Sequence, residues 1–111
     1  MASEEWFILT IRQKFADGLV EFTQHATDRS ILRHISLGEI EQAIASGEII
    51  EYYPDDKYGP SCLIFGYTLE RRPLHIQCSY PIRPLLKVIS VYQPDPKLWI
   101  DFRTRRSTNG L

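Results

Sequence analysis

The sequence predicts an α+β domain in which N-terminal helices pack on a four-stranded, mainly antiparallel sheet and a short C-terminal helix closes the chain. Two observations predict this fold. Apolar residues recur at helical spacing in the first half, whereas alternating apolar and polar residues, typical of strands, fill the second half. A length of 111 residues, of which 43% are hydrophobic, suits one compact domain over residues 1–111.

Three helices are expected in the first half, because apolar residues recur there every three to four positions between start and stop signals. These signals are Ser3 and Gly18, Thr23 and Arg33, and Ser36 and Gly47, with a short strand over residues 19–22 after the first helix. The third helix has the strongest signal, since Ser36 and Glu39 form a capping box, in which each side chain bonds the other's backbone.

Four strands are expected in the second half, where β-forming residues alternate between turn signals. They cover residues 48–53, 61–69, 74–80 and 85–92. The third strand alternates strictly, so that His75 and Gln77 share a polar face. Asp95 followed by Pro96 has the pattern of an N-cap and a first-turn proline, and it predicts the short C-terminal helix.

The net charge of −1 hides an asymmetric distribution. Residues 1–56 hold four Lys and Arg against eleven Asp and Glu, a net charge of −7, whereas residues 57–111 hold nine against three, a net charge of +6. Such asymmetry indicates a face that binds a polyanion. The alternative is a solvated acidic helical surface with an unrelated basic tail, which needs no binding partner.

Membrane, secreted and metal-binding classes are not favoured. The longest apolar runs are far shorter than the roughly 20 residues of a membrane helix, and the acidic N-terminus lacks the basic start of a signal peptide. Cys62 and Cys78 have no metal-ligand spacing and are expected to be buried, reduced thiols. We therefore expect a soluble, cytoplasmic protein without metal or cofactor, in which any catalysis is acid–base chemistry.

His25, Arg29 and Arg33 are spaced four residues apart, which places them on one face of the second predicted helix. Histidine exchanges protons near neutral pH, and arginine offers a planar charge suited to phosphate. Together they can activate a ribose 2′-hydroxyl and neutralise the attacked phosphate. The alternative is structural: the histidine packs locally and the arginines pair with Asp28 or Glu39.

His75 is a second candidate, in mid-strand on the polar face. Gln77 and Ser79 lie on the same face, and Arg71 and Arg72 stand just upstream. A binding face explains this pattern, because all these side chains form hydrogen bonds, and a solvated sheet surface explains it as well. Both interpretations stay open.

Six tyrosines crowd the predicted sheet, and aromatic residues interleaved with basic ones can stack bases and bind phosphates. Most are expected to be ordinary strand residues. Tyr92 is the most interesting, because it ends the last strand just before a proline-rich turn. His34 is expected to be structural, and Trp99 to fill the core.

Several motifs occur together in an order that resembles the bacterial domain-of-unknown-function family 4258. They are Thr23-Gln-His25-Ala-x-x-Arg29, Arg33-x-Ile35-Ser36, Gly47 to Asp55, Pro60-Ser61-Cys62-Leu63, Gly66, Arg72-Pro73-Leu74-His75 and Tyr92-x-Pro94-Asp95-Pro96-x-x-Trp99. The resemblance runs from about residue 20 to residue 103 and leaves a basic tail over 103–111. The chain departs from the pattern at His34, where a glycine is usual, and it is less basic than a typical ribosome-dependent toxin.

The resemblance implies a RelE-like domain related to the RelE and MqsR ribonuclease toxins, in the barnase–EndoU–colicin–RelE fold group. It implies metal-independent RNA cleavage that leaves a 2′,3′-cyclic phosphate, and a small antitoxin partner, often of the zinc-finger type. The family's catalytic residues correspond to His25, Arg29, His75 and Tyr92. We expect RNA contacts from Arg33, Arg71, Arg72 and Lys87.

In the resulting hypothesis, His25 is the general base or acid, Arg29 stabilises the pentavalent phosphate, and His75 or Tyr92 carries the second proton. This requires the fold to bring the helix of His25 against the basic sheet. The alternative is a non-catalytic RelE-like binding or regulatory module whose acidic N-terminal half docks a basic protein partner. A third possibility is a structural domain with a merely solvated strand face.

Overall fold

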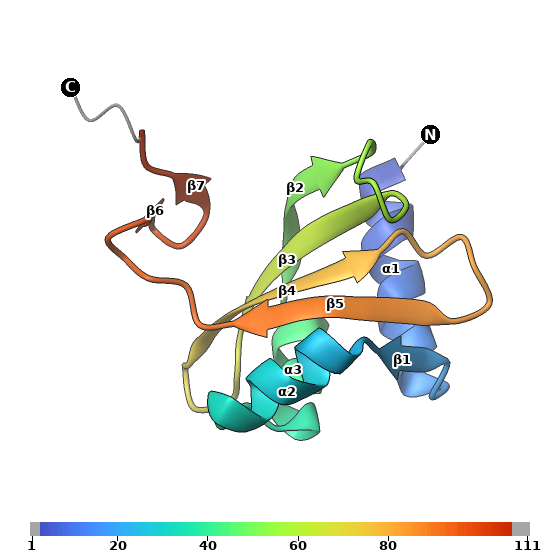
Figure 1. The fold of residues 1–111 in the computed structure, drawn as a ribbon, viewed down its shortest axis with the longest axis horizontal. Helices are drawn as coiled ribbons and strands as arrows, with labels where there is room; N and C mark the ends of the chain where they lie inside the picture. Colours follow the sequence, from blue (N-terminus) through green and yellow to red (C-terminus); the bar gives the residue numbers. More distant parts are fainter. Residues whose placement is uncertain (1–2, 108–111) are drawn as a thin grey trace.

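A computed structural model describes residues 3–107. Figure 1 shows helices, a central sheet and a small C-terminal hairpin. The elements are α1 (Ser3–Ala16), β1 (Val20–Phe22), α2 (Gln24–Leu32), α3 (Leu37–Ala45), β2 (Glu48–Tyr53), β3 (Ser61–Tyr67), β4 (Pro73–Ser79), β5 (Leu86–Tyr92), β6 (Trp99–Ile100) and β7 (Thr104–Arg105). Two predicted caps are confirmed: Thr23 accepts a hydrogen bond from the backbone N–H of Ala26, and Ser36 and Glu39 form the capping box.

The predicted four-stranded, mainly antiparallel sheet was wrong. The main sheet is mixed and has five strands in the order β1-β5-β4-β3-β2. Strands β2 to β5 pair antiparallel with their neighbours, whereas β1 pairs in parallel with β5 and places Val20 opposite Leu86. A strand of three residues has no periodicity that could identify its partner, and this partner lies far along the chain.

The predicted C-terminal helix was also wrong. Asp95 does act as a cap, since its side chain accepts a hydrogen bond from the backbone N–H of Lys97, but the chain completes only one turn. Asp101 and Phe102 then adopt φ values of +53° and +62°, in the left-handed region that no helix continues through. The segment therefore reverses and forms the antiparallel pair β6–β7.

The core lies between the helices and one face of the main sheet. It is filled by apolar side chains that include Ile11, Phe15, Ile40, Ile44, Ile64, Leu74, Ile76, Val88 and Val91. Gly66 on β3 lets α3 approach closely, because a Cβ at this position would clash with the carbonyl oxygen of Ala43. Arg12 of α1 donates hydrogen bonds to the carbonyl oxygens of Ile44 (3.1 Å) and Gly47 (2.8 Å), which satisfies the C-terminal end of α3.

We call the side of the main sheet opposite this core the open sheet face; it carries Leu63, Phe65, His75, Gln77, Ser79, Lys87 and Tyr92. One end of it is covered by residues 95–106, which we call the C-terminal cap. In Figure 1 this segment leaves β5 at the left of the view. Ion pairs from Arg103 to Glu48 (2.6 Å) and from Arg105 to Glu51 (3.0 Å) hold the cap to β2. No helix in residues 3–107 is long and apolar enough to cross a membrane.

Candidate functional site

His75 lies beneath the C-terminal cap, with none of its surface exposed. Its Nε2 is 2.6 Å from the carbonyl oxygen of Phe102, and its Nδ1 is 3.1 Å from the hydroxyl of Tyr92. A carbonyl oxygen only accepts hydrogen bonds, so the proton of the neutral ring belongs on Nε2. Nδ1 is then the acceptor, and the Tyr92 hydroxyl donates to it. The ring of Trp99 packs edge-on against the imidazole at 4.4 Å between centroids.

Burial determines the protonation of this pair. Desolvation lowers the pKa of His75, although the bond to the Phe102 carbonyl opposes the shift. Desolvation likewise raises the pKa of Tyr92. Near neutral pH the pair is therefore a neutral imidazole that accepts from a neutral phenol. His75 is neither on a solvated surface nor on an accessible binding face, so it can act on a ligand only through Tyr92.

Tyr92, by contrast, remains accessible and lines two cavities. The first, which we call the junction cavity, has a volume of about 590 Å³ and is also lined by Arg33, Arg72 and Trp99. The second, the sheet cavity, has a volume of about 390 Å³ and is also lined by Gln77. The tyrosine thus stands between a basic recess beside α2 and the polar middle of the open sheet face.

Arg33 connects α2 to this site. Its Nη1 donates to the carbonyl oxygen of Val91 (2.8 Å), the residue before Tyr92, and its positive charge opposes the rise in the pKa of Tyr92. His25 and Arg29 lie on the same face of α2, and both are exposed. Neither side chain forms a hydrogen bond or ion pair with any residue that the structure describes.

The structural pairings considered for this row do not form. The side chain of Asp28 accepts a hydrogen bond from Gln24 (2.8 Å) instead of pairing with an arginine of α2. Glu39 pairs with Arg72 (3.2 Å). His25 and Arg29 therefore stay exposed along α2, whereas Arg33 bonds the backbone of β5.

Arg72 holds the junction between α2 and α3. Its guanidinium donates to the carbonyl oxygens of Arg33 (2.9 Å) and His34 (2.8 Å), to Glu39, and to the side chain of Gln93 (3.0 Å). The backbone N–H of Ser36 and, to a lesser degree, this guanidinium lower the pKa of Glu39. The side chain of Arg72 is thus committed to protein contacts.

The remaining predicted RNA contacts lie apart. Arg71 sits in the turn between β3 and β4, where its guanidinium covers the ring of Tyr67 at 4.8 Å. Lys87 lies on β5, five residues before Tyr92, and lines another cavity. The structure therefore brings His75, Tyr92, Arg33 and Arg72 together, continues this group along α2 with Arg29 and His25, and leaves Arg71 and Lys87 elsewhere.

Comparison with protein families adds one finding. A family described as "Domain of unknown function (DUF4258)" matches residues 22–93. The chain belongs to the DUF4258 family. No curated protein and no solved structure matches the chain.

The DUF4258 match begins at the end of β1 and ends one residue after Tyr92. It thus contains every predicted site residue from His25 to Tyr92. The C-terminal cap, which buries His75 and supplies the Phe102 carbonyl, lies beyond the matched residues.

The DUF4258 chain also has a charged cluster that sequence reasoning missed. Arg105 of the cap pairs with Glu51, and Glu51 accepts a hydrogen bond from the hydroxyl of Tyr53 (2.5 Å). Desolvation and this bond raise the pKa of Tyr53 far above its usual value. Tyr53 and Arg105 line the sheet cavity beside Tyr92. No sequence pattern indicates this cluster, because Arg105 was expected to lie in a basic tail after a short helix, not in a hairpin against β2.

Among residues 3–107, no group of three or more His, Cys, Asp or Glu side chains could hold a metal ion. Cys62 and Cys78 are buried opposite each other on β3 and β4, with sulfur atoms 4.0 Å apart. This contact and, to a lesser degree, burial raise the pKa of Cys78, which keeps it a thiol.

Proposed function

We propose that this DUF4258 protein is a toxin-like, metal-independent endoribonuclease, as the resemblance to the RelE and MqsR toxins implies. One observation carries the proposal. Tyr92, whose hydroxyl is oriented by the buried neutral His75, lines a cavity that Arg33 also lines. A proton acceptor and a fixed positive charge at one cavity are what cleavage of a phosphodiester by its own 2′-hydroxyl requires.

The direction of the hydrogen bond suggests how a proton moves. Tyr92 donates to Nδ1 of His75, which leaves the lone pairs of the phenol oxygen free to accept from a substrate. As the 2′-oxygen attacks phosphorus, its proton passes to Tyr92 while the Tyr92 proton passes to His75. The bond from phosphorus to the 5′-oxygen breaks, and that oxygen takes a proton from water. The hydroxide so formed takes up the extra proton of His75, which returns through Tyr92. The products are a 2′,3′-cyclic phosphate and a 5′-hydroxyl.

Arg33 would neutralise the charge that develops on the phosphate. His25 lies eight residues before Arg33, about 12 Å along the helix axis, at 1.5 Å per residue. This separation is too large for His25 and Arg33 to act on one phosphate at close range. In this arrangement Arg29 and His25 contact neighbouring phosphates. The earlier hypothesis, with His25 and Arg29 at the reacting phosphate, stays the competing arrangement.

The test is RNA cleavage by purified full-length protein in EDTA, with Tyr92→Phe, His25→Ala and Tyr67→Phe. Loss of a proton carrier should slow cleavage about 100- to 10,000-fold in Tyr92→Phe. Tyr67→Phe is the matched control, because its hydroxyl forms no hydrogen bond with a described residue. If Tyr92→Phe cleaves at the wild-type rate and His25→Ala is inactive, the centre is at His25 and Arg29 instead. Thermal unfolding of each variant separates lost chemistry from lost folding.

A second candidate is a non-catalytic module, and a specific observation favours it. Both ring nitrogens of His75 and the guanidinium of Arg72 already have protein partners. Exposed carboxylates on the N-terminal half, including Glu4, Glu5, Glu21 and Glu41, would then dock a basic protein. Harmless overexpression and intact RNA, with capture of a basic partner, would favour the module. Growth arrest relieved by a small antitoxin protein would favour the nuclease.

A further inference from the structure

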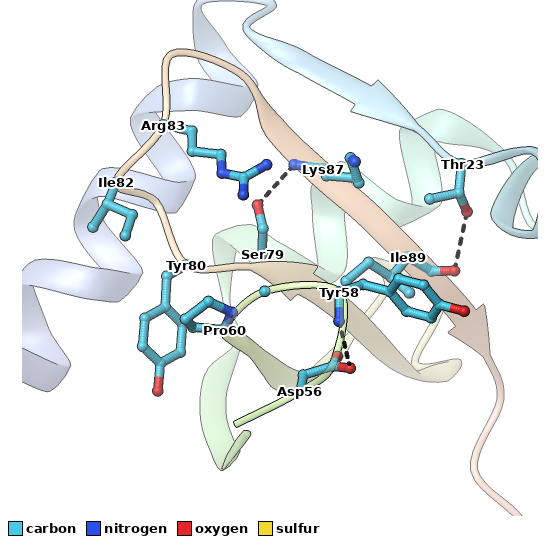
Figure 2. Close-up of a pocket in the computed structure, with 11 residues that line it drawn as sticks. Thr23, Asp56, Tyr58, Pro60, Ser79, Tyr80, Ile82, Arg83, Lys87 and Ile89 are labelled. Carbon is cyan, nitrogen blue, oxygen red and sulfur yellow. Dashed lines mark hydrogen bonds between the residues drawn. The ribbon is translucent and has the colours of Figure 1, made fainter. Parts of the chain in front are cut away.

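A third cavity, of about 230 Å³, lies on the open sheet face at the end away from the C-terminal cap. We call it the loop cavity, because the loop before β3 and the loop after β4 form its walls. Figure 2 shows Arg83 and Lys87 along one side of it and Tyr58 and Pro60 along the other. Asp56 lines both this cavity and the sheet cavity, so the loop cavity adjoins the recess that Tyr92 borders.

Two cationic side chains line the loop cavity. The side chains of Arg83 and Lys87 form no hydrogen bond or ion pair within residues 3–107. The backbone N–H of Lys87 donates to the Ser79 hydroxyl (3.0 Å), which fixes the strand from which the lysine extends. The one carboxylate at the cavity, Asp56, accepts hydrogen bonds from Ser61 (2.9 Å) and Gln77 (3.4 Å). The cavity lining therefore has a net positive charge, which favours an anionic ligand.

Tyr58 supplies an aromatic surface at the same cavity. Its side chain is 79% exposed, and the ammonium of Lys57 lies 5.0 Å from its ring centroid. The loop that carries it turns at Gly59, where φ is +108°, a conformation that other residues rarely adopt. Because most of the Tyr58 side chain is exposed, the ring keeps surface that a base can stack on even with Lys57 beside it.

We propose that the loop cavity is a subsite for one nucleotide of single-stranded RNA, with its phosphate between Arg83 and Lys87 and its base stacked on Tyr58. The inference rests on the proposed function, since it assigns a second contact on the strand cleaved at Tyr92. A volume of about 230 Å³ lies below the usual range of ligand pockets, so the cavity has room for no more than one nucleotide, whose base lies at the rim against Tyr58. Bases in a duplex are stacked on each other and cannot enter.

The position along the sheet defines where this nucleotide stands. Lys87 and Tyr92 are five residues apart on β5, about 17 Å at the rise of a strand. The strand would run from the junction cavity across the sheet cavity to the loop cavity. The nucleotide held by Tyr58 would then be separated from the cleaved bond by intervening nucleotides that cross the polar middle of the open sheet face.

The experiment measures binding apart from cleavage. Fluorescence anisotropy follows the full-length protein with a short labelled single-stranded 2′-O-methyl RNA, which lacks the attacking hydroxyl. We expect the Arg83→Ala/Lys87→Ala double variant to bind at least about tenfold more weakly and with a salt slope lower by about 0.7 for each lost phosphate contact. Tyr58→Ala should bind at least about fivefold more weakly. Lys97→Ala removes one exposed cation outside the cavity and should change affinity less than twofold.

Three outcomes overturn the proposal. They are Arg83, Lys87 and Tyr58 variants that bind like Lys97→Ala, an RNA duplex bound as tightly as the single strand, and no binding by the wild-type protein. Circular dichroism of each variant checks folding. We expect the variants to fold, because Tyr58, Arg83 and Lys87 line the cavity and lie outside the core. Cleavage of ordinary RNA by the wild-type protein is scored separately. If binding depends on the loop cavity but RNA is not cleaved, the subsite stands and the nuclease proposal fails. If RNA is cleaved but binding does not depend on the loop cavity, the nuclease proposal stands and the subsite fails.

Discussion

His34 tests the backbone reasoning most directly. It follows α2 with a φ of +55°, and the two hydrogen bonds of a Schellman motif surround it: from its own N–H to Ile31 (3.1 Å) and from Ile35 to Ser30 (2.8 Å). A left-handed backbone costs a residue with a side chain about 1–2 kcal/mol, and the freedom of glycine in the unfolded chain returns about 0.5–1 kcal/mol of this. His34→Gly should therefore raise the free energy of unfolding by about 0.5–1 kcal/mol.

Nothing offsets this gain, because the His34 side chain is exposed and forms no hydrogen bond with a described residue. Thermal unfolding should show a Tm higher by about 2–8 °C. His34→Ala keeps the Cβ and so keeps the strain, and it should show no comparable gain. If the glycine variant is no more stable than the alanine variant, the reasoning is refuted.

Two further predictions concern packing and pH. Gly66→Ala should lower the free energy of unfolding by about 1–3 kcal/mol, because the new Cβ clashes with Ala43. Gly38→Ala should not, because its Cβ would make only an ordinary contact with the Ser36 hydroxyl at 3.8 Å. Equal effects on urea unfolding would contradict this. Burial lowers the pKa of His75 below its ordinary 6.5, so the unfolded state binds the proton more readily. Stability should fall as the pH drops from about 6.5 toward the folded pKa and then level off; His75→Gln should remove this slope, and an unchanged slope would refute the assignment.

Sequence predicted the elements whose signals lie within a few residues. The capping box of Ser36 and Glu39 and the cap of Thr23 depend on neighbouring backbone groups, so they are visible without tertiary structure. The parallel pairing of β1 depends on a partner strand far along the chain. The C-terminal hairpin depends on left-handed residues, Asp101 and Phe102, whose types do not indicate that conformation.

The candidate site divides in the same way. His75 and Tyr92 were singled out separately, from strand alternation and from a position before a turn. Their contact depends on the register that places them opposite each other on β4 and β5, which periodicity alone does not define. The burial of His75 could not be predicted, because the segment that covers it was expected to be a helix. The role of Arg72 at the helix junction also requires the tertiary fold.

The two ion pairs of the C-terminal cap have a consequence for how such a protein diversifies. Arg103 and Glu48 are both about half exposed, and the Arg105 side chain is more exposed than either. Each ion pair therefore contributes only about 0–1 kcal/mol to the free energy of unfolding and weakens with salt. The C-terminal cap therefore depends mainly on the buried Trp99 and on the bond between His75 and the Phe102 carbonyl, and it lies outside the residues that match the family. Exchanging a few residues of the cap would alter how His75 orients Tyr92 while the five strands of the main sheet stay the same. Substitutions in the cap can therefore change the position of Tyr92 without changing the main sheet that carries it.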